Sequence, residues 1–236
     1  MTRALLCDLD DTLFDHTAST RAALAVVRAS TPAFQAWSPD EFDRRHRVVL
    51  EALHLEVLAG RWTVEAARVE RFRQLLGAAG VDESRAGTLD DLSWGYRRAY
   101  EAAWRLVPGA VDLVAAVKAA GWSLVIVTNN VVREQRLKIE RGGLAPYVDA
   151  LVTSEEFGAS KPDPRIIRHA IDRVGGSPEH AVVFGDSLST DIAGGRAAGV
   201  RTVWFNRWRV ESPDPELAEV HTLEPAADVI RTLGGD

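Results

Sequence analysis

Five short runs of β-branched and aliphatic residues constrain the fold of this chain more than any other feature of its sequence. Each run is closed by polar or Gly residues, and from the second run onward the runs alternate with segments of helical periodicity, such as residues 132–141. Near-continuous apolar strands that alternate with helices are typical of a parallel sheet covered on both faces. We therefore expect an α/β fold with a doubly wound, Rossmann-like parallel sheet. The predicted strands are residues 3–7, 122–127, 149–153, 181–184 and 200–205.

A long helical insertion interrupts this pattern. Asp8, after the first strand, and Thr128, after the second, are 120 positions apart, whereas a strand, its crossover helix and the next strand take about 30 residues or a little more. The intervening pattern is helical throughout. We expect a core domain formed by residues 1–16 and 106–236, with an inserted α-helical domain of residues 17–105. Its predicted helix starts and stops are Ser38, Thr63, Gly60, Gly77 and Gly80.

The composition of the chain argues against nucleic acids and membranes as binding partners. The 236 residues carry a formal net charge of −6, and no long tract of one charge sign marks a surface for nucleic acids or membranes. No run approaches the roughly 18 apolar residues of a membrane span. The single cysteine, Cys7, lies in the first apolar run and is expected to be a small buried hydrophobe. We therefore expect a cytoplasmic protein, a monomer or homodimer, whose partners are small molecules rather than nucleic acids or membranes.

Polar side chains gather near the ends of four predicted strands. In open parallel sheets, ligands bind beyond the carboxyl ends of the strands, so residues there are the first candidates for a site. Asp11, Asp15 and Asp163 are better explained as turn formers or helix N-caps. The remaining candidates are four carboxylates, one hydroxyl, one amide and one lysine: Asp8, Asp10, Asp186, Asp191, Thr128, Asn129 and Lys161.

Three of these carboxylates imply a cation. Asp8, Asp10 and Asp186 would repel one another at one edge of the sheet unless a positive charge compensates them. Mg²⁺ fits best, because it takes oxygen ligands, tolerates few protein carboxylates and is common beside substrate phosphate. We therefore expect a Mg²⁺ site at the strand ends.

The other candidates suit a phosphate group. Thr128 offers a hydroxyl, and Asn129 and Asn130 offer backbone N–H groups at the start of a predicted helix. Lys161 supplies positive charge. The chain strongly prefers Arg and contains only three lysines, so a compact ammonium group at this position suggests contact with both a carboxylate and a phosphoryl oxygen.

Taken together, the segments "DLDDT", "VTNN", "SKPDP" and "GDSLSTDIAGGRAAG" resemble the motifs of the haloacid dehalogenase-like (HAD) hydrolase superfamily. The inserted helices resemble the C1-type cap domain of that superfamily. The resemblance implies that Asp8 is the nucleophile that attacks phosphorus and forms an aspartyl-phosphate. Asp10 would be the general acid that protonates the leaving oxygen and then the base that activates water. Thr128 and Lys161 would hold the oxygens of the transferring group.

The resemblance also implies a metal site, in which Asp8, the backbone carbonyl of Asp10 and Asp186 bind Mg²⁺. Asp191 would orient Lys161 or a metal-bound water. Such an enzyme is a Mg²⁺-dependent phosphomonoester hydrolase. The chain looks most like the branch that contains pyrimidine 5′-nucleotidases and N-acylneuraminate-9-phosphatases. The expected substrate is therefore a small phosphorylated metabolite, such as a nucleoside 5′-monophosphate or a sugar phosphate.

Other activities fit the sequence less well. Dehalogenases of the superfamily lack an acid at the position of Asp10, and phosphonate-cleaving members use a lysine of the cap, which residues 17–105 do not contain. The same absence weakens, without excluding, a sugar phosphomutase. A two-component receiver domain would carry its phosphoacceptor after the third strand, where no suitable Asp stands. A non-catalytic phospho-ligand-binding protein on this scaffold stays open as a further alternative.

Overall fold

The computed structural model describes residues 3–81 and 89–234 and contains a six-stranded parallel sheet in the order β3-β2-β1-β4-β5-β6. The doubly wound α/β core expected from the sequence is confirmed. The sixth strand was not predicted, because its two residues are too few to show a periodic pattern. The strands are β1 Ala4–Cys7, β2 Ser123–Thr128, β3 Ala150–Thr153, β4 Ala181–Gly185, β5 Arg201–Phe205 and β6 Glu219–Val220.

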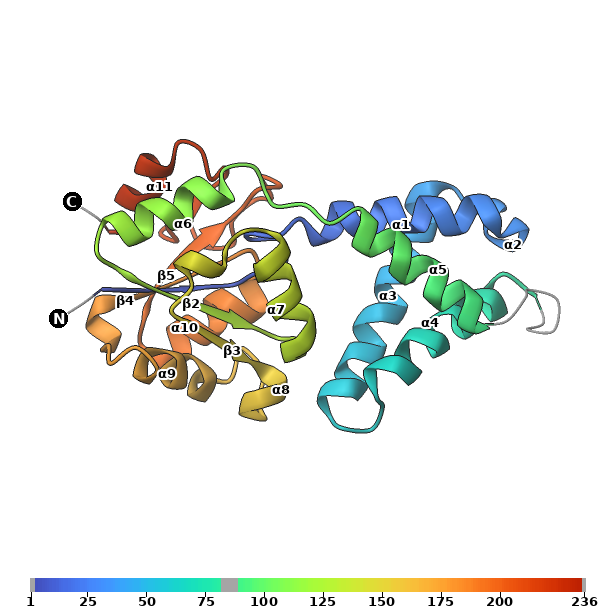
Figure 1. The fold of residues 1–236 in the computed structure, drawn as a ribbon, viewed down its shortest axis with the longest axis horizontal. Coiled ribbons are helices and arrows are strands. Elements are labelled where there is room, and N and C mark those ends of the chain that lie inside the picture. Colours follow the sequence, from blue (N-terminus) through green and yellow to red (C-terminus); the bar gives the residue numbers. More distant parts are fainter. Residues whose placement is uncertain (1–2, 82–88, 235–236) are drawn as a thin grey trace. The chain divides into compact units, whose positions relative to one another are not determined.

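Helices cover both faces of the sheet (Figure 1). Helices α6 and α11 pack together on one face, and α9 and α10 pack together on the other. The close packing of α10 requires glycine, since a Cβ atom on Gly195 would lie 2.5 Å from Thr202 Cγ2 and 3.0 Å from Val183 Cγ2. The helices of the core are α6 Ala110–Ala119, α7 Val132–Arg141, α8 Ser154–Phe157, α9 Pro164–Asp172, α10 Ala193–Ala198 and α11 Ala226–Leu233.

The central strand β1 carries the first candidate residue. All four residues of β1 are buried, and Cys7, which is buried as expected, pairs with Ile126 of β2 and Phe184 of β4. The backbone N–H of Asp8 continues this ladder by donating to the carbonyl of Phe184 at 2.9 Å. The order of the strands reverses at β1, and ligands bind at such a point in open α/β sheets. The ends of β1, β2 and β4 therefore form one edge at the switch point.

Helices are the only regular secondary structure in the described residues of the insertion, 16–81 and 89–104. Residues 16–104 form one compact unit, and the rest of the described chain forms the other. Two expected helix starts are present, because Ser38 accepts a hydrogen bond from the Glu41 N–H at 3.2 Å and Thr63 accepts one from the Ala66 N–H at 3.1 Å. The predicted domain limits stay a prediction. The helices are α1 His16–Ser30, α2 Pro32–Gln35, α3 Pro39–Leu58, α4 Val64–Ala78 and α5 Leu89–Ala102.

One predicted helix stop is wrong. Gly77 lies inside α4 rather than after it. The residue that takes the left-handed conformation beyond this helix is Gly80, with φ near 71°, which costs glycine little. Gly60, also a predicted stop, has φ near 70° just after α3.

The two points where the chain leaves and re-enters the sheet unit are joined to each other. The N–H of Asp15 donates to the carbonyl of Arg105 at 3.0 Å, and the N–H of Val107 donates to the carbonyl of Leu13 at 2.9 Å. The buried carboxylate of Asp15 also contacts the guanidinium groups of Arg105 and Arg207, each at 3.2 Å. Asp15 thus belongs to this junction.

Among the described residues, no helix is long and apolar enough to cross a membrane.

Candidate active site

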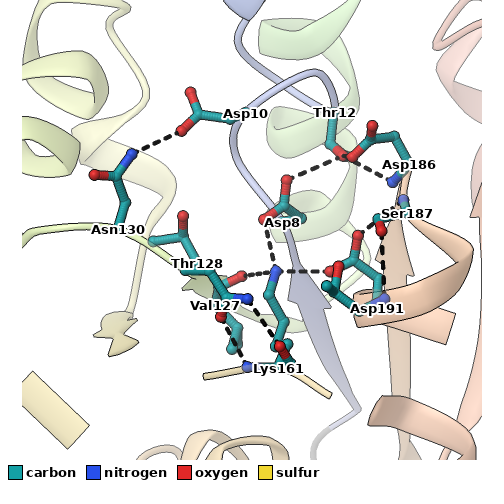
Figure 2. Close-up of polar contacts among 12 residues, drawn as sticks. Asp8, Asp10, Thr12, Val127, Thr128, Asn130, Lys161, Asp186, Ser187 and Asp191 are labelled. Carbon is teal, nitrogen blue, oxygen red and sulfur yellow. Dashed lines mark hydrogen bonds and ion pairs between the residues drawn. The ribbon is translucent and has the colours of Figure 1, made fainter. Parts of the chain in front are cut away.

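Lys161 lies at the centre of the strand-end residues (Figure 2). Its Nζ atom lies 2.6 Å from each of three acceptors, namely Asp8 Oδ1, Asp191 Oδ1 and the carbonyl oxygen of Val127. An ammonium group has three N–H donors, so these contacts use all of them. The lysine is 4% exposed. Burial by itself lowers the pKa of Lys161, but the Asp191 and Asp8 carboxylates outweigh it and raise that pKa above its usual value. Lys161 is therefore a fixed positive charge.

The backbone of Lys161 is held by Asn129. The Asn129 side chain accepts a hydrogen bond from the Lys161 N–H at 2.8 Å and donates one to the Lys161 carbonyl at 2.9 Å. The sequence suggested only a backbone role for Asn129, and this side-chain role was missed. An amide carries one acceptor and two donors, which suits it to bind both polar groups of a single residue. Asn129 thereby connects the loop before α9 to the end of β2.

Two of the three clustered carboxylates, those of Asp8 and Asp191, contact this lysine, and Asp186 lies beside them. Oxygen atoms of Asp8, Asp186 and Asp191 lie within 4.8 Å of one another. Burial raises the pKa of the Asp8 carboxyl to about 7, the nearby Lys161 acts against this, and Asp191 adds to it. Burial, followed by repulsion from Asp8 and Asp191, also raises the pKa of Asp186 well above its usual value. Three carboxyl groups thus lie together beside a single lysine, so the lysine alone does not balance the negative charge of all three when they are ionised.

The donor set of this cluster fits a hard divalent cation. Carboxylate oxygens are ligands that Mg²⁺ and Ca²⁺ prefer, and a bound cation would offset both the burial and the repulsion that raise the pKa values of Asp8 and Asp186. The expected ligands Asp8 and Asp186 both belong to the cluster. Asp191, expected to orient Lys161, contacts Lys161 directly and also lies among the possible ligands. The backbone carbonyl of Asp10 stays a prediction as a ligand.

Neighbouring residues set the positions of these acids. A Cβ atom on Gly185 would lie 2.3 Å from the Asp191 carboxylate, so only glycine at the end of β4 leaves space for that side chain. The N–H of Ser187 donates to the other oxygen of Asp191 at 3.1 Å. The indole N–H of Trp204 donates to the carbonyl of Asp186 at 2.8 Å. Sequence reasoning missed Trp204, because an aromatic residue in a buried strand does not reveal which polar group it meets.

Thr12 links two of the acids. Its hydroxyl lies 3.4 Å from Asp8 Oδ2 and 3.5 Å from Asp186 Oδ1, and it accepts a hydrogen bond from the Asp186 N–H at 3.2 Å. Figure 2 shows Thr12 between the two carboxylates. It is fully buried, so it ties the loop after β1 to the end of β4.

Asp10 lies apart from the cluster. Figure 2 shows its carboxylate directed toward Asn130 and away from Asp8 and Lys161. The side chains that donate to it include Asn130 Nδ2 at 3.2 Å, Gln135 Nε2 at 2.8 Å and Lys138 Nζ at 2.6 Å. Gln135 and Lys138, both on α7, were missed as site residues. Their spacing of three residues on a predicted helix and the scarcity of lysine in this chain were the available signals.

Thr128, the last residue of β2, is also connected to this second group. Its hydroxyl oxygen accepts a hydrogen bond from Gln135 Nε2 at 3.0 Å, and the residue is 2% exposed. Gln135 therefore bridges Asp10 and Thr128. The predicted residues thus fall into two linked groups. Lys161 gathers Asp8, Asp191 and Asn129, with Asp186 beside them, and Gln135 joins Asp10 to Thr128.

The neighbouring acids outside the cluster have structural positions. Asp11 has a positive φ of 60° in the turn after β1, a conformation that Asp tolerates better than most residues. Asp163 caps α9, because its side chain accepts a hydrogen bond from the Arg165 N–H at 2.9 Å. Both residues thus serve the turn and N-cap roles expected for them.

Comparisons with a family model, with curated proteins and with solved structures all find hydrolases, and the first agrees with the resemblance seen in the sequence motifs. The family model of haloacid dehalogenase-like hydrolases matches residues 2–199. The chain is 34% identical over 242 residues to a phosphoserine phosphatase of Thermus thermophilus, covering 92% of this chain and 93% of that protein. It is 38% identical over 124 residues to the pyrimidine 5′-nucleotidase YjjG of Escherichia coli, covering 50% and 55%. Among solved structures, the HAD-hydrolase YfnB of Bacillus subtilis bound to magnesium matches with a TM-score of 0.74 and 28% identity, covering 99% of each chain.

Proposed function

Because this chain belongs to the haloacid dehalogenase-like hydrolase family, we propose that it is a Mg²⁺-dependent phosphatase of small phosphorylated metabolites, with Asp8 as its nucleophile. The observation that carries the proposal is the Asp8 carboxylate at the switch point of the sheet, bound by the buried Lys161 and flanked by two further acids. The relatives named phosphatase and nucleotidase support the reaction class.

Asp8 is suited to covalent catalysis. A carboxylate oxygen of Asp8 attacks phosphorus, the bond from phosphorus to the leaving oxygen breaks, and Asp10 donates a proton to that oxygen. Water then attacks the phosphorus of the aspartyl-phosphate while Asp10 removes a proton from that water. The bond between phosphorus and Asp8 breaks, which regenerates the Asp8 carboxylate and releases inorganic phosphate. Because both residues lie after β1 in the same loop, one segment supplies the nucleophile and the proton.

The phosphoryl oxygens need donors and positive charge. The Thr128 hydroxyl accepts a hydrogen bond from Gln135, which leaves its own proton for an oxygen of the substrate. Lys161 supplies positive charge beside Asp8. The Asn129 side chain is occupied by the backbone of Lys161, so Asn129 would contribute its N–H group, as the sequence suggested.

The acidic cluster would hold the metal. We assign Mg²⁺ to Asp8, Asp186 and the backbone carbonyl of Asp10, with Asp191 orienting Lys161 or a metal-bound water. When bound, the ion neutralises negative charge on the transferring phosphoryl group. The crystal structure of YfnB bound to magnesium supports this choice of metal.

The acids at the metal site predict a pH-dependent stabilisation by Mg²⁺. A buried Asp whose folded-state pKa is raised to about 7 contributes stability that is fully present below its unfolded pKa of about 4 and is lost as the pH rises through about 7. Without metal, this contribution to the free energy of unfolding is therefore smaller at about pH 8 than at about pH 5. Mg²⁺ requires the ionised carboxylate, so the increase in Tm caused by excess MgCl₂ over EDTA is expected to be larger at the higher pH.

The comparison with and without Mg²⁺ controls for other titrating groups. Burial and the nearby Arg71 lower the pKa of His46 in the inserted unit, so His46 stabilises the fold in the opposite direction, above its unfolded pKa. Its contribution is the same with MgCl₂ and with EDTA, and it cancels in the difference. An increase in Tm that is equal at both pH values, or that is larger at low pH, would contradict the metal assignment.

Substrate class is tested by phosphate release. With MgCl₂, the protein is expected to release inorganic phosphate from p-nitrophenyl phosphate and from one or more members of a panel of nucleoside 5′-monophosphates, sugar phosphates and phosphoserine. Replacing MgCl₂ with EDTA should reduce the rate to the background of the buffer. We propose that the inserted helices of residues 17–105 act as a cap that favours such small substrates over proteins or nucleic acids.

The same panel separates the alternatives. Transfer of phosphate within a sugar bisphosphate, without net release, would identify a phosphomutase. Saturable binding of a phosphorylated metabolite with no turnover would identify a non-catalytic binding protein. A cytoplasmic location and a monomeric or homodimeric state also remain predictions.

A further inference from the structure

A second buried lysine contacts the candidate acid and base. Lys138 on α7 has a side chain with 0% exposure, and its Nζ lies 2.6 Å from Asp10 Oδ1. The ammonium group also lies 4.7 Å from the centre of the Phe14 ring and 3.5 Å from Glu134 Oε1. A lysine is rarely buried completely, because removing its charge from water is costly unless the charge is paired. The ion pair with Asp10 is the shortest of these contacts.

The other oxygen of Asp10 is bound from the same helix. Gln135 stands three residues before Lys138, so the two side chains share one face of α7. Gln135 is completely buried, and its Nε2 donates both to Asp10 Oδ2 at 2.8 Å and to Thr128 Oγ1 at 3.0 Å. The orientation of this amide is determined by its neighbours, since a rotated amide would place its oxygen against the carboxylate. Each oxygen of Asp10 thus accepts a hydrogen bond from α7, and Asn130 adds a longer one to Oδ2 at 3.2 Å.

This restraint is useful because Asp10 stands just before a turn, residues 11–13. Asp10 follows the last strand residue by three positions, and the next residue has a positive φ. The Asp10 side chain is 22% exposed, so the sheet does not enclose it as it encloses Asp8. A carboxylate there would lose entropy whenever it took one orientation for proton transfer. The contacts from α7 fix that orientation in advance.

We propose that Lys138 and Gln135 are positioning residues, which hold the Asp10 carboxylate for proton transfer and tie it to Thr128. The proposal rests on the proposed phosphatase reaction. Neither residue needs to touch the substrate. Lys138 sets where one oxygen of Asp10 lies, and Gln135 sets the other and fixes its distance from the hydroxyl that would bind phosphate.

Lys138→Met tests the proposal with a side chain that can lie against Phe14 without charge. Phenyl phosphate has a poor leaving group that needs a proton from Asp10, and general acid catalysis contributes about 10²-fold or more. We expect kcat for phenyl phosphate to fall by about 30-fold to 100-fold, with KM changed by less than about threefold.

p-Nitrophenyl phosphate separates the two roles of Asp10 in this variant. Its leaving group departs without a proton, so Asp8 should still be phosphorylated quickly, while hydrolysis of the aspartyl-phosphate is slow. The expected signature is a burst of p-nitrophenol of about one equivalent of enzyme followed by slow turnover. In an Asp10→Asn background, Lys138→Met should cause no further loss, because the group that it positions is already absent.

Two further variants complete the experiment. Gln135→Met, which keeps the lysine, should give the same pattern with a smaller loss. Lys118→Met is the matched control, because Lys118 also pairs with a carboxylate, that of Asp149 at 2.6 Å, but on the surface of the core, and its rates should stay at the wild-type level. The Tm of each variant shows whether it is folded.

A purely structural role for Lys138 would give a different result. In that case the rates for both substrates would fall by the same factor, no burst would appear, and the losses would add to those of Asp10→Asn. Wild-type rates in Lys138→Met would also overturn the positioning role, while leaving the proposed phosphatase function in place. A wild-type protein that releases no phosphate from any substrate would instead overturn the proposed function, and the positioning role with it.

Discussion

Asp8→Asn is expected to lower kcat for phosphate release by about 10³-fold or more, because removal of a covalent nucleophile leaves only the binding and charge-neutralising groups. The variant should stay folded. Burial raises the pKa of Asp8 to about 7, so the protein without metal gains little from this charge, and Asn keeps the shape. Unfolding in EDTA near pH 8 should therefore show a free energy of unfolding equal to that of the wild type or higher.

Asp11→Asn is the matched control for this experiment. Asp11 belongs to the same acidic segment, but it occupies the turn with φ near 60°, a conformation that Asn also tolerates. Its kcat should stay within about twofold of the wild type. Comparable residual activity in Asp8→Asn and Asp11→Asn would show that the reaction does not proceed through Asp8.

Lys161→Met is expected to have the largest effect on stability. The lysine is the shared partner of Asp8 and Asp191, and its removal leaves two buried carboxylates without that positive charge. Breaking a buried ion pair by removing one partner costs about 3–5 kcal/mol. Urea unfolding in EDTA near pH 8 should show a loss of this size in the free energy of unfolding, and phosphate release should fall to background.

The surface lysine again provides the control. Lys118→Met removes an ion pair that is about one third exposed, and such pairs contribute about 0–1 kcal/mol. In Asp8→Asn/Lys161→Met, one of the two buried charges is absent, so the stability loss caused by Lys161→Met should be smaller than in the wild-type background. Equal stability of Lys161→Met and Lys118→Met would contradict the central position of Lys161 in the cluster.

The sheet was predictable because its strands are apolar over their whole length. Runs such as residues 181–184 are buried on both faces in a parallel sheet, so burial and sequence coincide. The strand Glu219–Val220 is too short for such a pattern. The stop at Gly77 was wrong because glycine only weakens a helix, whereas the left-handed conformation that follows α4 is taken by Gly80.

The candidate site was predictable at the level of strand ends and unpredictable at the level of side-chain direction. Lys161 contacts Asp8 and Asp191 because the three residues belong to segments that follow different strands, and these segments lie together at the carboxyl edge of the sheet. Gln135 and Lys138 lie on the helix after β2, and a helical pattern shows which residues share a face without showing what that face contacts. The contacts of Asn129 and Trp204 were unpredictable for a related reason, since their partners are backbone groups distant in sequence.

The junction at Asp15 and Arg105 has an evolutionary consequence. The residues of the sheet unit that flank the 89-residue unit are hydrogen-bonded to each other, so a turn of a few residues can close the gap at small entropic cost. Recombination can replace such a unit as a cassette without rearranging any strand of the sheet. With the cap role proposed for this unit, substrate choice can change in a single genetic exchange, whereas the strand-end residues can be altered only one substitution at a time.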